Sequence, residues 1–372
     1  MAAKRPSIRF ALLASLLAGG LLACQLIVGV EDDVGAVRPP DAGFSDAAAD
    51  RDSGEPTCAL RKPPGPPAAS TVGAIDNIET VFYALERVAI DPTDAGGVIG
   101  YDLDNRCTGL PTEPIADAAV NRAPCVTPMR VEPFADGDGG VDNAFRDLFG
   151  AFAFATHPSP DRAANFFNDD IEVGARTLIV AIKDYNGAAD DTEVNVALVA
   201  SEGLTAAVDG GPRWDGTDVW THTEGWLNGP TFTLRGYVRD HVLVASPIKD
   251  ELRLSFGGFS VMLHTATIIA KIAPMANRLE DGTIIGRAIA NEFIAAAGQI
   301  PVKDKYCGLS ENPGVLGVIC AQRDLGSNAD PSATCDSISV GIGFSAVAAR
   351  VEVPAQKDPA LVACDAAPTC SP

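Results

Sequence analysis

The stretch ARTLIVAIKDYNGAADDTEVNVALVAS, residues 175–201, decides the fold class. β-Branched and aliphatic residues dominate both halves, and the Asn-Gly dipeptide at 186–187 is a turn signal that favours a hairpin. In the second half Val194, Val196 and Leu198 alternate with other residues, which predicts that they share one face of a strand. The stretch therefore predicts two antiparallel strands.

Further strand-like segments follow this hairpin at short spacing. They lie at 229–238, 241–248, 251–258 and 259–274. Short strands with few helices between them are typical of an antiparallel β-sandwich or jelly roll. The sequence thus predicts a mainly β protein, whose β-rich domain spans residues 71–300.

Two helical segments are expected to interrupt the strands. The first is marked by aromatic and aliphatic residues at helical spacing: Phe145, Leu148, Phe149 and Phe152. The second is TIIGRAIANEFIAAAGQI at 283–300, where an apolar residue recurs every four positions and Gly298 is a stop signal.

The N-terminal residues have the layout of a secretory signal. A positively charged start precedes an apolar run from Phe10 to Ala23, which is too short to span a bilayer comfortably. The run ends in LLAC, which resembles a bacterial lipobox and implies removal of residues 1–23 and lipidation of Cys24. Gln25 after the cysteine implies sorting to the outer membrane. The alternative is an ordinary cleaved signal with an incidental cysteine.

Residues 24–70 are expected to form an acidic tether between the lipid and the domain. Proline, alanine, glycine and aspartate dominate residues 31–70, and no apolar period survives there. The chain carries a net charge of −21, and loss of residues 1–23 removes three positive charges and no negative charge, which gives −24. So acidic a surface repels phosphate backbones and anionic lipids, which argues against nucleic acid and favours cations as partners.

The cysteines predict a disulfide framework. The chain has nine, and eight remain once Cys24 is lipidated, an even number that indicates up to four disulfides in an exported chain. Two local pairs are favoured by their spacing: Cys107 with Cys125, and Cys364 with Cys370. Residues 301–372 carry five of the eight cysteines and are expected to form a disulfide-stapled extension packed on the sandwich.

The stretch FADGDGGVDNAF, residues 134–145, is a candidate metal-binding loop. An EF-hand loop that starts at Asp136 fails, because Gly140 replaces an oxygen ligand and Val141 replaces the required glycine. A calcium site of another kind remains open, since hard cations need only several oxygens brought together and YDLDNRC at 101–107 supplies more carboxylates. The candidate ligands are Asp102, Asp104, Asp136, Asp138 and Asp142.

The same stretch has a simpler interpretation. Asp142 directly precedes a helical run and is well placed to cap the helix N-terminus. The two Asp-Gly dipeptides at 136–139 are ordinary turn signals. A metal role for Asp136 and Asp138 therefore requires the segment 101–107 to fold back beside them.

All three tryptophans lie in PRWDGTDVWTHTEGW, residues 212–226. Exposed indoles beside carboxylates suit stacking on sugar rings. The candidate ligand-binding residues are Trp214, Asp215, Asp218 and Trp220. Tryptophans in a long loop of a β protein more often anchor the loop to the core, and this alternative is favoured.

Enzyme signatures are largely missing from the sequence. It contains no G-x-S-x-G, H-E-x-x-H or G-x-x-x-x-G-K motif. GIGFSA at 341–346 formally matches a dinucleotide fingerprint, but its apolar residues alternate as in a strand. The sequence favours a non-catalytic binding or structural module. The alternative is an extracellular glycan-active hydrolase, whose paired carboxylates would meet only in the fold.

Several motifs together resemble a group of myxobacterial-type outer-membrane lipoproteins with no assigned activity. They are LLAC, YDLDNRC, GVDNAF and PRWDGTDVW. The resemblance implies export and lipid anchoring. The expected protein is held in the outer membrane by its lipid and faces the periplasm or the cell surface. Calcium is its candidate cofactor, and a glycan or an envelope protein is its candidate partner.

Overall fold

The computed structural model describes residues 59–69, 79–90, 98–108, 123–127, 134–149, 167–206, 210–223, 231–256, 259–300, 306–327 and 330–354, with 362, 364, 369 and 370. All of them belong to one compact unit, Ser53–Pro372. The predicted signal peptide, the lipidation site Cys24 and most of the predicted tether lie outside the described residues, as do Phe152 and Trp226.

Ten strands and three labelled helices are found among these residues. The strands are β1 (Val81–Ala89), β2 (Thr177–Lys183), β3 (Asp191–Ser201), β4 (Val219–His222), β5 (Leu234–Arg239), β6 (Val242–Pro247), β7 (Glu251–Phe256), β8 (Phe259–Ile272), β9 (Arg278–Ile289) and β10 (Ser337–Pro354). The helices are α3 (Asn168–Glu172), α4 (Ala290–Ala297) and α5 (Pro313–Ala321). A further helical turn covers residues 145–149, where the first helix was predicted.

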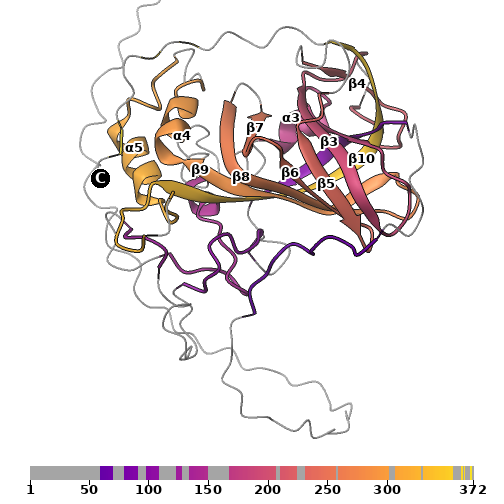
Figure 1. Cartoon of the computed structure of the whole chain (residues 1–372). Coiled ribbons are helices and arrows are strands. Elements are labelled where there is room, and N and C mark those ends of the chain that lie inside the picture. Colours follow the sequence, from indigo (N-terminus) through magenta and orange to yellow (C-terminus); the bar gives the residue numbers. More distant parts are fainter. Residues whose placement is uncertain are drawn as a thin grey trace, which may run out of the picture. The chain divides into compact units, whose positions relative to one another are not determined.

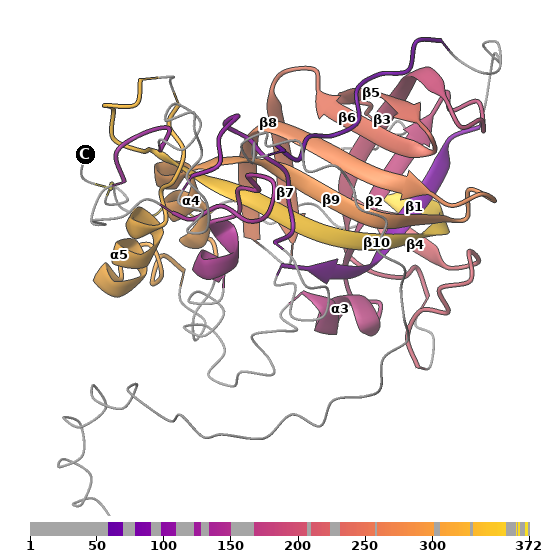
Figure 2. The same cartoon turned by 90° about the horizontal axis from the view of Figure 1, so that it is seen from below.

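The sheet closes into an eight-stranded antiparallel barrel. Its strands follow the order β1-β2-β3-β5-β6-β8-β9-β10, and β10 pairs back with β1. β7 adds to the edge of β8, and β4 runs parallel to β10. With 42% strand and 12% helix, the predicted mainly β, antiparallel class is confirmed, but the arrangement is a barrel and not the expected sandwich. In both views α4 and α5 lie together at one end and β4 lies at the other (Figures 1 and 2).

Irregular pairing helps the sheet to curve and close. β1 and β10 shift register between Leu85 and Arg87, and β9 and β10 shift between Phe344 and Ala346. Each shift bends a strand and increases its local twist, which a closed barrel requires. Such shifts depend on the partner strand, so alternation along a single strand did not reveal them.

The opening hairpin forms as predicted. β2 and β3 pair in register from Thr177–Ser201 to Lys183–Asn195. Val194 and Val196 are fully buried in the core. Gly187 lies in the connecting loop with φ 76°, a conformation that favours glycine.

One contiguous apolar core contains residues from all eight barrel strands. Its members include Leu85, Val180, Val196, Leu234, Leu243, Ile268, Ile284 and Ile338. Phe293 of α4 belongs to the same core and meets Phe145 edge-on, with ring centroids 6.0 Å apart. The helical turn at 145–149 and α4 therefore pack on the same part of the core.

The second predicted helix is half wrong. Residues 283–289 continue β9, where Ile284 pairs with Ile268 of β8 on one side and with Ile342 of β10 on the other. The helix α4 starts only at Ala290 and ends at the predicted stop, Gly298. β-Branched residues favour a strand when both neighbours are present, and these neighbours are distant in sequence.

The predicted C-terminal extension is partly a wall of the barrel. β10 is the strand that pairs with both β9 and β1. The four predicted disulfide cysteines are all disulfide-bonded, but both predicted pairings are wrong. Three disulfides join cysteines that both lie among the described residues: Cys125–Cys335, Cys307–Cys364 and Cys320–Cys370. Chain folding brings distant segments together, so short spacing did not select the partners.

The last part of the predicted tether lies against the barrel. The Arg61 amide donates to the Gly139 carbonyl at 2.7 Å, and the Asp102 amide donates to the Arg61 carbonyl at 2.9 Å. Tyr237 of β5 donates its hydroxyl proton to the Pro64 carbonyl at 2.5 Å. This arm, residues 59–69, therefore packs on β5 and on the two acidic loops, which are the stretches 101–107 and 134–145.

Candidate metal centre

The acidic loops occupy an edge of β10 that β1 does not cover. β1 pairs with β10 only from residue 343 to residue 349, whereas β9 pairs with it from residue 337. Asn143 fills part of the gap: its amide nitrogen donates to the carbonyls of Ile99 at 2.8 Å and Gly341 at 3.0 Å, and its amide oxygen accepts from the Gly341 amide at 3.1 Å. The GVDNAF motif is therefore the segment that docks on the barrel wall.

A glycine pair lets the two acidic loops pack closely. Gly139 and Gly140 have φ values of 74° and 68°. A Cβ on Gly140 would collide with the Arg106 carbonyl and lie 3.2 Å from the sulfur of Cys107. The segment 101–107 thus folds back on the DGDGG turn, which is the arrangement that the metal hypothesis required.

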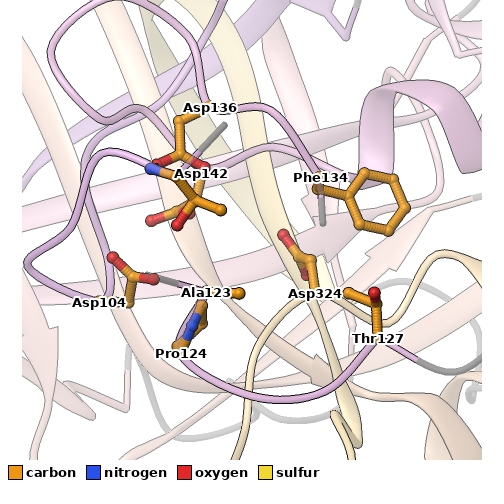
Figure 3. Close-up of a pocket in the computed structure, with 9 residues that line it drawn as sticks. Asp104, Ala123, Pro124, Thr127, Phe134, Asp136, Asp142 and Asp324 are labelled. Carbon is orange, nitrogen blue, oxygen red and sulfur yellow. The ribbon is translucent and has the colours of Figure 1, made fainter. Parts of the chain in front are cut away.

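Carboxylates from three distant segments converge on one small cavity (Figure 3). Candidate ligand atoms of Asp102, Asp104 and Asp142 lie within 4.8 Å of one another. The residues that line the cavity are Asp104, Thr108, Ala123, Pro124, Thr127, Phe134, Asp136, Asp142 and Asp324. The cavity has room for roughly one water-sized sphere, so it suits an ion and not an organic ligand.

Asp102 belongs to the cluster, but one of its carboxylate oxygens is hydrogen-bonded and the other is ion-paired. Oδ1 accepts from the amides of Asp104 at 3.1 Å and Asn105 at 2.6 Å. Oδ2 lies 2.7 Å from Nζ of Lys62, on the docked arm. Asp102 therefore shapes the 102–105 turn and holds the arm, and it does not line the cavity.

Three of the lining carboxylates accept hydrogen bonds from nearby protein groups. Asp136 Oδ2 accepts from the Thr108 amide at 2.5 Å, and Asp142 Oδ2 accepts from the Leu103 amide at 2.7 Å. Asp324 Oδ1 accepts from the Ser339 amide at 2.7 Å, and its Oδ2 accepts from the Ser339 hydroxyl. These bonds orient the carboxylates and leave part of their acceptor capacity for a cation.

Two polar side chains at the cavity have unmet bonding capacity. Neither carboxylate oxygen of Asp104 has a hydrogen-bond partner of good geometry in the described structure, although both are buried. The hydroxyl of Thr108, a residue only 3% exposed, also lacks a partner there. A buried polar group without a partner costs free energy, and a bound cation would satisfy both groups.

Burial and mutual repulsion raise the pKa values of the cluster. Burial, followed by the charge of Asp102, raises the pKa of Asp104 to about 6. Burial raises the pKa of Asp136 to about 8 and that of Asp324 to about 7, with nearby carboxylates adding to both shifts. Burial and the charges of Asp104 and Asp136 raise the pKa of Asp142 well above its usual range. Buried acids that repel one another favour the protonated state.

Comparison with known proteins gives no further guide. No family model, curated protein or solved structure matches the chain. The site therefore rests on its own geometry.

The structure separates the five predicted ligands. It places Asp104, Asp136 and Asp142 around the cavity, whereas Asp138 is exposed on the turn and outside the lining. The predicted helix cap is also wrong, because the Ala144 amide at the helix start donates to the Ser339 hydroxyl and the Asp142 carboxylate bonds to Leu103.

Sequence reasoning missed Asp324 and Thr108. Asp324 stands alone among apolar and basic neighbours, CAQRDLG, and lies far along the chain from the other acids. Threonine beside a cysteine carries no ligand signal. The pairing of Leu325 with Ser337, at the start of β10, brings Asp324 to the acidic loops.

The tryptophan loop is anchored to the outside of the barrel. Trp220 is fully buried against Ile179 and Ala197, and the Trp214 ring lies 5.5 Å from it. Asp218 accepts from the amides of Arg213 and Trp214 at 3.1 and 2.8 Å, which closes the turn, while Asp215 is exposed and bonds Thr217. A buried indole offers no face to a sugar, so the geometry favours the anchoring alternative.

None of the helices that the structure describes has the length and apolarity of a membrane-spanning helix.

Proposed function

We propose that this protein is a lipid-anchored outer-membrane module without catalytic activity that binds one Ca2+ ion in the cavity between its acidic loops and the barrel. The observation that carries the proposal is the convergence of four carboxylates on a cavity where, in the described structure, the Asp104 carboxylate and the Thr108 hydroxyl have no hydrogen-bond partner of good geometry. The lipid anchor and the location come from the lipobox-like LLAC and its cysteine, Cys24. The barrel then serves as a stable body held off the membrane by an acidic tether.

The proposed ligands are side chains of the cavity lining. They are Asp104, Thr108, Asp136, Asp142 and Asp324. Carboxylate and hydroxyl oxygens are ligands for hard cations, and no sulfur or imidazole lines the described cavity. Asp102 retains its ion pair with Lys62. It supports the ligands indirectly, because its carboxylate stabilises the turn that positions Asp104.

Calcium fits this cavity better than magnesium. Ca2+ takes six to eight oxygens in flexible geometry and accepts bidentate carboxylates, whereas Mg2+ usually keeps several of its waters. A cavity with room for roughly one water-sized sphere offers little enclosed space for that hydration. The same restriction speaks against a glycan-active hydrolase at this cluster, because a sugar ring does not fit between the carboxylates.

Calorimetric titration of the full-length protein with CaCl2, together with thermal melts in Ca2+ and in EGTA, tests the proposal. We expect one bound ion and a melting temperature that falls when EGTA is added, because ligand binding to the folded state alone stabilises it. Asp104→Asn should abolish or strongly weaken binding. Asp138→Asn is the matched control, since it removes the same charge from an exposed position of the same loops. A melt that EGTA leaves unchanged, with no binding heat, would sink the proposal.

A further inference from the structure

One wall of the cavity is a short segment with few attachments. Residues 123–127 supply Ala123, Pro124 and Thr127 to the lining. Among the described residues, the backbone hydrogen bonds of this segment to residues 333–335 are made by Val126. The Val126 amide donates to the Ala333 carbonyl at 2.8 Å, and the Val126 carbonyl accepts from the Cys335 amide at 2.9 Å. The Val126 residue is 52% exposed and contributes little apolar anchoring.

The Cys125–Cys335 disulfide joins this wall to residues 333–337, which pair with the segment that carries Asp324. Cys335 is two residues before Ser337, which bridges to Leu325, the neighbour of Asp324. The sulfur of Cys125 also lies 3.4 Å from the carbonyl oxygen of Asp324. Three segments, 123–127, 333–337 and 324–325, are therefore stacked side by side, and the disulfide is the covalent bond between the first two.

The disulfide is buried and lies next to the ligands. Cys125 is 3% exposed and Cys335 is fully buried. Metal ligands bind an ion tightly only when neighbouring groups hold them in place. Loss of such support typically lowers the affinity for the metal 10–100-fold. Without the disulfide, the described attachments of this wall to residues 333–335 are two backbone hydrogen bonds, so the wall would open more readily and let water compete for the ion.

We infer that the Cys125–Cys335 disulfide assembles one wall of the Ca2+ cavity, so that the protein acquires its full Ca2+ affinity only when this disulfide is closed. The inference rests on the proposed Ca2+ site and adds its regulation. An exported chain would gain the site after oxidation, and the reduced chain would leave the ion largely unbound.

A pair of double variants of the full-length protein tests this inference. Cys125→Ser with Cys335→Ser removes the wall disulfide, and Cys320→Ser with Cys370→Ser removes the one that joins α5 to the C-terminal residues, neither of whose cysteines lines the cavity. Titration with CaCl2 should show a Kd about tenfold or more higher in the first variant. The second should stay within about twofold of the unsubstituted protein, as expected of an independent site.

Redox titration of the unsubstituted protein provides a readout that does not depend on the variants folding. In a glutathione buffer, two glutathione thiols reduce one protein disulfide to two thiols and form one glutathione disulfide. Linkage requires Ca2+ to favour the oxidised form of Cys125–Cys335 by the same factor by which the disulfide favours Ca2+. Mass spectrometry should therefore show that saturating CaCl2 shifts the reduction of this pair and not that of Cys320–Cys370.

The outcomes separate the two proposals. Equal Kd values in all three proteins, or an unshifted redox midpoint of Cys125–Cys335 in a protein that does bind Ca2+, would overturn this inference and leave the Ca2+ site standing. Absence of Ca2+ binding by the unsubstituted protein would overturn both.

Discussion

Ser339 on β10 holds the carboxylate of Asp324 with both its amide and its hydroxyl group. The amide nitrogen lies 2.7 Å from Oδ1, and the hydroxyl donates to Oδ2 while accepting from the Ala144 amide at 2.7 Å. One barrel residue thus positions a cavity carboxylate and also fixes the start of the helical turn that follows Asp142. The Ser339 hydroxyl is therefore one of the groups that couple the barrel wall to the acidic loops.

Substitution of this residue should weaken Ca2+ binding. In Ser339→Ala the carboxylate of Asp324 keeps only its bond to the backbone amide and can turn away from the cavity. We expect the Kd for Ca2+, measured by calorimetry, to rise about tenfold. Ser337→Ala on the same strand loses a hydrogen bond to Asp336 and is the control. Equal Kd values for the two variants would show that Asp324 needs no positioning.

The stability of the calcium-free protein should fall as the pH rises. The folded-state pKa values of Asp104, Asp136 and Asp324 are raised to about 6, 8 and 7, from a usual value of 3.8. The folded state therefore holds protons that the unfolded chain releases above pH 4, and the free energy of unfolding decreases from about pH 4 to about pH 8. Urea melts in EGTA across this range measure the slope.

The same melts have a matched control and a clear contrary result. Asp324→Asn should flatten the slope by removing one of the raised groups, whereas the exposed Asp138→Asn should not. Saturating Ca2+ should also reduce the slope, because the cation favours the ionised carboxylates. A free energy of unfolding that rises steadily between pH 4 and pH 8 in EGTA would contradict the raised pKa values.

Gly341 should not tolerate a side chain. Its Cβ would collide with the Ile99 carbonyl and lie 2.9 Å from the amide nitrogen of Asn143, so the loop must move off β10. We expect Gly341→Ala to lower the free energy of unfolding by about 1–3 kcal/mol and to weaken Ca2+ binding. Gly343→Ala is the control, because its Cβ would lie 3.2 Å from the movable Ile99 Cδ1 and 3.4 Å, an ordinary contact distance, from the Cβ and the carbonyl oxygen of Ala89. Similar losses in both variants would argue against a special role for the loop contact.

The tryptophan loop should respond to packing and not to glycans. Trp220→Ala should cost about 3–5 kcal/mol of stability, as expected for a large buried side chain. In a Trp226→Phe background the remaining indole fluorescence comes from Trp214 and Trp220. We expect no spectral shift when polysaccharides are added, and a saturable shift would restore the sugar-stacking hypothesis.

The fold was predictable to the extent that it depends on neighbours in sequence. Alternation in 190–201 and in 341–346 identified β3 and part of β10. The sequence predicts a helix for 283–289 because residues four apart lie on one face of a helix, but they also lie on one face of a strand. Pairing with β8 and β10 is what distinguishes the strand from the helix. The barrel, in place of a sandwich, required the pairing of β1 with β10, which no local pattern shows.

The candidate site was likewise predictable only where its residues are neighbours in the sequence. The motifs YDLDNRC and FADGDGGVDNAF marked three of the four carboxylates at the cavity, because acids clustered with glycines are visible in the sequence. Asp324 and Thr108 stayed hidden because each is an isolated residue whose role depends on the segment opposite it. Asp138 lies outside the cavity lining, on an exposed turn.

The sequence by itself determined the strand content, the hairpin at 175–201, the acidic charge and the number of cysteines available for disulfides, because each depends on composition or on local periodicity. The tertiary structure alone decided the closure of the barrel, the partners of Cys125 and Cys335, and the meeting of Asp104 with Asp324. These depend on which distant segments pack together, and packing is set by the shape of the whole core and not by any single stretch of chain.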